Sequence, residues 1–287
     1  MVSGSVANYN DITITVSGTV NLILPQGSKL DLSYGTISIS DGGTLNIYGQ
    51  ESGSGTLTLG GYGRSTSSGI SLGSGSALNI HGGTITANGY CYNNKVDAAP
   101  GIDVGTGTLT VYGGEVNAEA GTSSNAGYGA GIRVTSGGTV SIYGGTVTAT
   151  GASNKSALGV SGAGIGGNGG SSAGETCGNV NIYGGTVTAT GGSGGSGASA
   201  GIGGGQGGTI SNQGGGGNVT ITGGTVTATG GKNSTGAVQA PGIGGAVYSS
   251  SQGNAGSFST GENGSAVITA NGGIQAGTSG CSCIVNG

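Results

Sequence analysis

Apolar and polar residues alternate with a period of two along most of this chain. In the stretch VSIYGGTVTA at 140–149, the first, third, eighth and tenth positions are apolar and small or polar residues lie between them. Period-two alternation is typical of a β-strand with one buried face. The Gly pair in the middle marks a corner, because glycine adopts backbone dihedrals that other residues avoid. The stretch therefore predicts two short strands joined at a corner.

The same block recurs along the chain, and a shorter block containing Gly-Ile precedes most copies. From Leu78 onward the copies begin 31, 31, 40 and 39 residues apart. Self-similarity at such a period indicates a solenoid or a propeller. The long block reads LNIYGQ at 45–50, LNIHGGTITA at 78–87, LTVYGGEVNA at 109–118, VSIYGGTVTA at 140–149, VNIYGGTVTA at 180–189, VTITGGTVTA at 219–228 and, degenerate, VITANGGIQA at 267–276. The short block reads GISL at 69–72, GIDV at 101–104, GIRV at 131–134, AGIGG at 163–167, AGIGG at 200–204 and PGIGG at 241–245.

Each repeat supplies three short strands and no helical pattern, which predicts an all-β, single-domain parallel β-helix (β-solenoid). A propeller blade would need four strands joined by hairpins, and the tandem order of the strands argues against that. Parallel crossovers are right-handed in nearly all proteins, so we predict the right-handed form. We expect about seven to eight coils, spaced about 4.8 Å apart.

The repeats divide this one domain into two parts. Residues 1–66 alternate without the full block and are expected to be atypical, capping coils. Residues 67–287 are expected to be repeat coils of the same β-helix, with 265–287 degenerate. Gly-rich corner inserts separate the strands, and they are either a binding side or flexible filler. The inserts lie at 88–100, 119–130, 151–163, 191–200 and 230–241, and at 166–179, 203–218 and 245–265.

Composition excludes several classes of protein. The chain has 75 Gly but only 3 Pro among 287 residues, without a Gly-X-Y period, so it is not collagen. Only 6% of residues are charged and the net charge is −4. With no basic cluster and no apolar run of 18 residues, we expect neither nucleic-acid binding nor membrane insertion. The start, MVSG, lacks the pattern of a signal peptide, so we expect an extracellular or cell-surface domain of a larger secreted protein.

The four cysteines are Cys91, Cys177, Cys281 and Cys283. An even number fits an extracellular chain, and three disulfide pairings are open. The Cys281-x-Cys283 pair lacks a second pair, and the chain has a single His, so we expect no metal site and no cofactor.

The acidic residues argue against an enzyme. Only Asp97, Asp103, Glu115 and Glu119 fall near one another, with Arg133 one coil further on. Asp103 and Arg133 hold the same place in successive Gly-Ile strands, which predicts a cross-strand ion pair. We therefore expect no catalytic residue and a noncatalytic protein.

An aromatic row is the first candidate site. Stacked coils would bring these side chains about 4.8 Å apart on the outside of the solenoid. The row either stabilises the solenoid or binds pyranose rings through flat apolar faces and the amides of Asn46, Asn79 and Asn181. The row contains Tyr48, His81, Tyr112, Tyr143 and Tyr183, ends at Thr222, and has candidate extensions in the loop residues Tyr62, Tyr90, Tyr92, Tyr128 and Tyr248.

A threonine face is the alternative candidate site. Stacked T-V-T-A-T strands would form a flat grid, which either stabilises the sheet by cross-strand pairs or binds ice. The grid resembles the T-x-T faces of β-helical antifreeze proteins, although Glu115, Asn117 and Glu119 interrupt it one coil before. Its members are Thr146, Thr148, Thr150, Thr186, Thr188, Thr190, Thr225, Thr227 and Thr229.

The blocks V-x-I-Y-G-G-T-V-T-A-T-G and A-G-I-G-G resemble the tandem repeats of bacterial surface proteins described as carbohydrate-binding domain-containing. They are also similar to a pectin-lyase-like, calcium-associated family of right-handed β-helices that binds polysaccharides. That family often has Asp before the Gly-Ile strand, and here the position holds Ser68, Pro100, Ala130, Ala163, Ala200 and Pro241.

The resemblance implies an extracellular, noncatalytic glycan-binding or adhesin-type module of a bacterial surface protein, with a polysaccharide or another glycan as its partner. The alternative is a structural spacer, or a subunit of a surface layer or filament that associates head to tail through open strand edges. Ice binding is a minor alternative.

Overall fold

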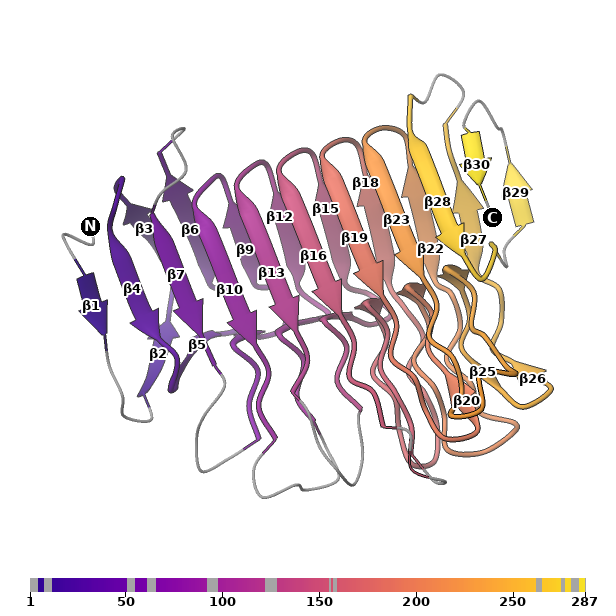
Figure 1. The fold of residues 1–287 in the computed structure, drawn as a ribbon. Helices are drawn as coiled ribbons and strands as arrows, with labels where there is room; N and C mark the ends of the chain where they lie inside the picture. The colour runs from indigo at the N-terminus through magenta and orange to yellow at the C-terminus, as the bar shows by residue number, and fades with distance from the viewer. Residues whose placement is uncertain are drawn as a thin grey trace.

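The computed structural model shows a rod in which the chain winds through three parallel sheets (Figure 1). It describes residues 5–7, 12–50, 55–60, 66–91, 98–121, 128–154, 156, 159–261, 265–274, 277–279 and 284–286. Successive strands pass from one sheet to the next, and every third strand returns to the same sheet over most of the rod. Seen from the N-terminal end, the chain turns clockwise as it recedes (Figure 1). The fold is a right-handed parallel β-helix, as the repeats predicted.

The first sheet holds the T-V-T-A-T strands, and we call it the threonine sheet. Its strands, in spatial order, are β1 (Ser5–Ala7), β4 (Lys29–Leu32), β7 (Thr56–Leu59), β10 (Thr84–Asn88), β13 (Glu115–Glu119), β16 (Thr146–Thr150), β19 (Thr186–Thr190), β23 (Thr225–Thr229), β28 (Val267–Asn271) and β30 (Ile284–Asn286).

The second sheet holds the Gly-Ile strands, and we call it the isoleucine sheet. Its strands are β2 (Ile12–Val16), β5 (Gly35–Ile39), β8 (Ile70–Leu72), β11 (Ile102–Gly105), β14 (Ile132–Val134), β17 (Ile165–Gly166), β21 (Ile202–Gly203) and β24 (Ile243–Gly244).

The third sheet carries the aromatic row at its edge, and we call it the tyrosine sheet. From the N-terminal end its strands are β3 (Thr19–Leu24), β6 (Thr44–Gly49), β9 (Ala77–Ile80), β12 (Thr108–Val111), β15 (Thr139–Ile142), β18 (Asn179–Ile182), β22 (Asn218–Ile221), β27 (Ser257–Ser259) and β29 (Gly277–Ser279).

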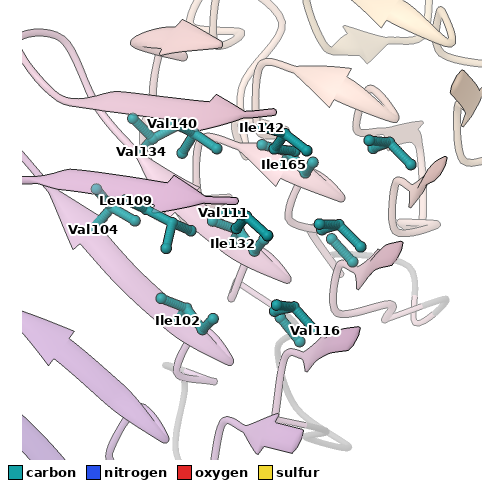
Figure 2. Close-up of a cluster of buried hydrophobic side chains, with 14 of the residues drawn as sticks. Ile102, Val104, Leu109, Val111, Val116, Ile132, Val134, Val140, Ile142 and Ile165 are labelled. Carbon is teal, nitrogen blue, oxygen red and sulfur yellow. The ribbon is translucent and has the colours of Figure 1, made fainter. Parts of the chain in front are cut away.

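A continuous apolar column fills the inside of the rod. Strand pairing keeps equivalent residues in register, so that Val140 lies between Leu109 and Val180, and all three are fully buried. Figure 2 shows isoleucine, valine and leucine side chains from successive coils lying in rows that face one another. The strict alternation of the sequence therefore becomes one buried column, because a period of two sends every second side chain inward.

The N-terminal strands belong to the same β-helix. Strands β2 to β7 continue the three sheets without a break in register, although they lack the full sequence block. In the described part of the chain, β2 and β3 are the terminal strands of their sheets. Ile14 and Val20 hold positions that are buried in the next coil, yet here they are 37% and 39% exposed.

The Gly-Gly corner is tight, and glycine is required in it. Gly145 has a φ of 80°, and a Cβ there would lie 2.4 Å from the carbonyl oxygen of Gly114 in the preceding coil. This approach is closer than any side chain tolerates. The same holds for Gly114, Gly185 and Gly224, so the second Gly of these pairs is fixed both by its backbone dihedral and by the stacking of the coils.

The described inserts are ordered structure, which corrects the interpretation of them as flexible filler. Gly192 N donates to the carbonyl of Gly162, and Gly231 N donates to the carbonyl of Ser199, so each insert hydrogen-bonds to another. A small antiparallel sheet forms among them from β20 (Gly197–Ala198), β25 (Val247–Tyr248) and β26 (Ser251–Gln252). Backbone hydrogen bonds of this kind hold a segment without a large apolar core.

Candidate functional site

The aromatic row forms as predicted, at the edge where the tyrosine sheet meets the Gly-Gly corner. Each member follows the last residue of its strand or, for Tyr48 in β6, lies near the strand's end. Ring centroids of successive members lie 4.5, 4.7, 5.4 and 4.7 Å apart, with planes inclined by only 10° to 15°. The order along the rod is Tyr48, His81, Tyr112, Tyr143 and Tyr183.

The stacking changes what the row offers to a ligand. Rings that lie nearly parallel and about 5 Å apart cover one another's faces. The expectation of flat apolar faces open to a sugar is therefore wrong for the inner rings. Tyr112 and Tyr143 are still 50% and 49% exposed, so their outer edges and phenolic hydroxyls are what faces solvent.

The asparagines beside the row form a ladder among themselves. Asn46 Nδ2 donates to Asn21 Oδ1 at 2.8 Å, and Asn79 Nδ2 donates to Asn46 Oδ1 at 2.9 Å. The amides of Asn46 and Asn79 were expected to be available to a glycan, but these hydrogen bonds already engage them. Asn181 lies further along the same row of positions, in register with Ser141 and Thr220.

Two of the described loop tyrosines, Tyr128 and Tyr248, do not extend the row. Tyr128 is only 8% exposed and packs with Val160. Tyr248 belongs to β25, among the inserts, far from the Gly-Gly corner in the fold (Figure 1). Tyr62 and Tyr92 lie outside the described residues.

The threonine grid forms in the predicted register. Equivalent threonines of β16, β19 and β23 lie in register and form three rows across the sheet. The rows are Thr146–Thr186–Thr225, Thr148–Thr188–Thr227 and Thr150–Thr190–Thr229. The interruption is also real, because Glu115, Asn117 and Glu119 pair directly with the first threonine strand. The register is thus confirmed, and ice binding by this face stays a prediction.

An ion cluster joins the regular coils to an insert. Arg133 Nη1 lies 2.9 Å from Asp103 Oδ1, which confirms the predicted cross-strand pair. Glu175, from the insert at 166–179, adds two hydrogen bonds, at 2.6 Å to Nη2 and 2.7 Å to Nε. Sequence reasoning missed Glu175 because its insert has no counterpart in the earlier coils.

The electrostatics of this cluster favour a structural role. The hydrogen bonds that Arg133 donates to Glu175 raise the pKa of the Arg133 guanidinium, and the nearby carboxylate of Asp103 adds to the effect. A bidentate arginine–carboxylate pair has fixed geometry, and Glu175 Oε2 also accepts from the backbone N of Asn168. Glu175 therefore holds the insert against the coil, and Asp103 joins two successive coils.

Two of the four cysteines lie in the described part of the chain, and both are buried. Cys177 has a free thiol and packs into the main apolar column. Burial raises the pKa of Cys177 from 9.0 to about 12, because the apolar surroundings disfavour the thiolate. Cys91 packs in a separate small cluster with Ala98, Ala120 and Ala152, while Cys281 and Cys283 lie outside the described residues.

Comparison with known protein families matches the Beta helix repeat at residues 78–103, 109–132, 140–171, 180–206 and 219–247. The chain contains a Beta helix repeat domain. The matched segments of this repeat domain begin with the tyrosine-sheet strands and continue through the threonine-sheet strands, so they include the rows at the Gly-Gly corner. No curated protein and no solved structure matches the chain.

Among the residues that the structure describes, no group of three or more His, Cys, Asp and Glu side chains gathers where it could hold a metal ion. In the same residues, no helix has the length and apolarity to cross a membrane.

Proposed function

We propose that this protein is a noncatalytic glycan-binding or adhesin-type module of an extracellular bacterial surface protein. The observation that carries the proposal is the row of phenol edges along the rod, exposed by 39% to 50% at its tyrosines. The row repeats once per coil, so a polymer lying along the rod would meet the same groups again and again. The resemblance of the repeats to bacterial carbohydrate-binding surface proteins supports the same proposal.

The rigidity of the row favours binding of an extended polymer. Stacked rings have little rotational freedom, so few side-chain rotamers would be frozen on binding. Thr146, Thr186 and Thr225 lie just across the Gly-Gly corner and are exposed, which adds a second row of hydroxyls parallel to the first. The two rows together present donors and acceptors of the kind that hydroxyl-rich polymers satisfy.

The test is a glycan array, followed by titration of the polysaccharides that bind. The sharpest variant is the double substitution Tyr143→Phe and Tyr183→Phe, because it removes the hydroxyls and keeps the ring stack. Two lost hydrogen bonds at about 0.5–1.5 kcal/mol each predict a loss of affinity of roughly fivefold to 150-fold. Tyr34→Phe, outside the row, is the matched control and should leave affinity unchanged.

Two results would contradict the proposal. One is the absence of binding to any polysaccharide at millimolar concentration. The other is equal affinity of the double variant and the unaltered protein, which would place the contact elsewhere and leave the stacked rings with a structural role only.

The second candidate function is that of a self-associating structural subunit, and the exposed apolar side chains of the first described coil favour it. Ile14 and Val20 are exposed at positions that the core of the rod buries in the following coil. Open strand edges pair readily with another chain. Introducing Ile14→Lys and Val20→Lys should abolish assemblies seen by size-exclusion chromatography and electron microscopy, with Val267→Lys as control. A strict monomer at every concentration would exclude this function.

A further inference from the structure

A cleft of about 510 Å³ lies among the C-terminal inserts, away from the Gly-Gly corner. Clefts of this size are in the range that holds small ligands. Segments from four different inserts line it, and the lining residues are Gly195, Ser196, Ile210, Asn233, Ser234, Thr235, Val238, Tyr248 and Ser249. The small sheet of β20, β25 and β26 lies at this side of the rod, with the loops that extend from the isoleucine sheet (Figure 1).

The walls of the cleft are held in fixed positions by hydrogen bonds. Asn233 Oδ1 accepts from Thr235 Oγ1 and from the backbone N of Val238, both at 3.1 Å, which fixes the turn between them. Ser234 Oγ donates to the carbonyl of Gly195 at 2.8 Å and so joins this turn to the neighbouring insert. These bonds leave Nδ2 of Asn233 as a donor in the wall of the cleft.

The remaining wall contains the only non-glycine residue with positive φ in the described part of the chain. Ser249 has a φ of 51°, and its backbone N donates to the carbonyl of Ser196 at 2.9 Å. Such conformations persist where the surroundings impose them, and they cluster at binding sites. Here the constraint holds Tyr248 against the insert that carries Ser196, since β25 pairs with β20 directly before it.

The floor beneath the cleft is packed and rigid. Ala198, Ala240 and Val247 form a small apolar cluster of their own, and Val238 packs against it while lining the cleft. Nearby, Gly194 lies so close to the fully buried Gln206 that a Cβ would be 1.9 Å from Gln206 Oε1. The cleft is therefore preformed, which lowers the entropy that a ligand must overcome.

The lining combines three apolar side chains with several uncharged polar groups. Tyr248, Val238 and Ile210, which is 51% exposed, supply apolar surface. Hydroxyl and amide groups come from Ser196, Asn233 and the neighbouring serine and threonine positions, and none of the described residues that line the cleft is charged. An apolar patch beside neutral donors and acceptors matches a ligand with one apolar face and many hydroxyls, and the absence of charge disfavours an ionic ligand.

We propose that this cleft is a second binding site that takes a neutral saccharide, held between Tyr248 and the polar wall around Asn233. The inference goes beyond the proposed function, because it does not require the aromatic row to bind anything. Unlike the stacked rings of the row, Tyr248 lines a hollow, so its side chain can contact a ligand directly.

The test is a titration of the isotope-labelled protein with neutral mono- and disaccharides and with the matching uronic acids, followed by amide NMR shifts. Neutral sugars should shift resonances of the lining residues at millimolar concentration, and the uronic acids should bind at least tenfold more weakly. Tyr248→Ala and Ile210→Ala should each reduce the affinity for the neutral sugar at least tenfold. Val267→Ala, equally exposed on the threonine sheet, is the matched control and should change nothing.

Three results would overturn the inference: no shifts at the cleft with any neutral sugar, equal binding of uronic acids, or unchanged affinity after Tyr248→Ala in a protein with an unaltered circular dichroism spectrum. The same variants separate this site from the aromatic row. Suppose that Tyr143→Phe with Tyr183→Phe weakens polysaccharide binding while Tyr248→Ala does not change the binding of small sugars. This result would support binding by the aromatic row and contradict binding by the cleft. The reverse pattern would support binding by the cleft and contradict binding by the row.

Discussion

Two regions of this solenoid, the Gly-Gly corner and the inserts, are held together in different ways. At the Gly-Gly corner, side chains repeat coil after coil, and their stacking carries the regularity: rings follow rings at 4.5–5.4 Å. Among the inserts, the close contacts are between backbone atoms of neighbouring segments. A Cβ at Gly192 would lie 1.8 Å from the carbonyl oxygen of Ala152, and one at Gly205 would lie 2.0 Å from that of Asn168. Glycine thus orders the long inserts by letting neighbouring backbones approach closely enough to hydrogen-bond.

The strongest test of this difference is Gly203→Ala, at a contact between two backbones. Gly203 has a φ of 141°, and its added Cβ would lie 1.8 Å from the carbonyl oxygen of Gly244. Overpacking costs about 1–3 kcal/mol, and the strained backbone costs about 1–3 kcal/mol more. Urea unfolding should therefore show a loss of several kcal/mol.

Gly236→Ala is the control for this change, because it has a φ of 75° but nothing within 4 Å of the added Cβ. It should lose only the backbone strain, about 1–2 kcal/mol. Equal losses for the two variants would show that the close approach of the backbones does not matter.

The side-chain column should be broken by Ile182→Ala. Ile182 is fully buried and lies in register between Ile142 and Ile221. Truncating a buried isoleucine costs about 2–5 kcal/mol through lost burial and a residual cavity. Thermal and urea unfolding would measure it, and Val267→Ala, at 46% exposure, should change stability by less than about 0.5 kcal/mol.

The ion cluster links the regular coils to an insert, and Glu175→Gln tests this link. The substitution keeps the shape of the side chain but removes the charge that pairs with Arg133. We expect a loss of about 1 kcal/mol, because the pair is partly exposed to solvent. Hydrogen exchange should increase in the insert at 166–179. Glu119→Gln, exposed on the threonine sheet, should have no effect on either measurement.

The pH dependence of stability tests the packing of Cys177, which lies in an insert and contacts the apolar column. The loss of stability should be smallest near neutral pH and should grow at alkaline pH. The folded-state pKa of about 12 lies above the ordinary value of 9.0. The buried neutral thiol therefore contributes its full stability below pH 9 and loses it progressively as the pH rises towards 12. We expect a loss of about 1.4 kcal/mol by pH 10, measured by urea unfolding as a difference between the native protein and Cys177→Ala.

Chemical labelling checks the same residue independently. The thiol of Cys177 should resist iodoacetamide in the folded protein at pH 8 and should react fully in urea, since only an exposed thiolate attacks. Rapid labelling of Cys177 in the native state would contradict its place in the core.

The sequence predicted the coil but not the cleft, and the reason is physical. The alternation of apolar and polar residues and the Gly-Gly pair determine each strand and corner locally. The register that pairs Thr146 with Thr186 therefore followed from the repeated sequence block alone. Asp103 and Arg133 could be paired by the same rule. Where the sequence of a coil differs from that of its neighbours, the repeat pattern does not predict which residues come into contact. Glu175, Tyr248 and Ser249 all lie in inserts of unequal length, and only the folded backbone brings them to their partners.

The site was predictable to the same extent. The positions in the aromatic row could be read from the spacing, whereas the orientation of the rings could not, because the tilt of each ring depends on its stacked neighbour. Likewise, Asn46 and Asn79 stood next to the row as expected, but the sequence did not reveal that each amide would find its partner in the next asparagine.

The unequal spacing of the repeats has a mechanical consequence. Hydrogen bonds between coils run along the rod, so tension applied at its two ends would pull coils away one at a time. A coil of 31 residues would release roughly 100 Å of extended chain, and one of 39 or 40 residues roughly 130 Å. A rod that anchored a cell to a surface would therefore lengthen in unequal steps under tension. The coils with the largest inserts would release the greatest length of chain.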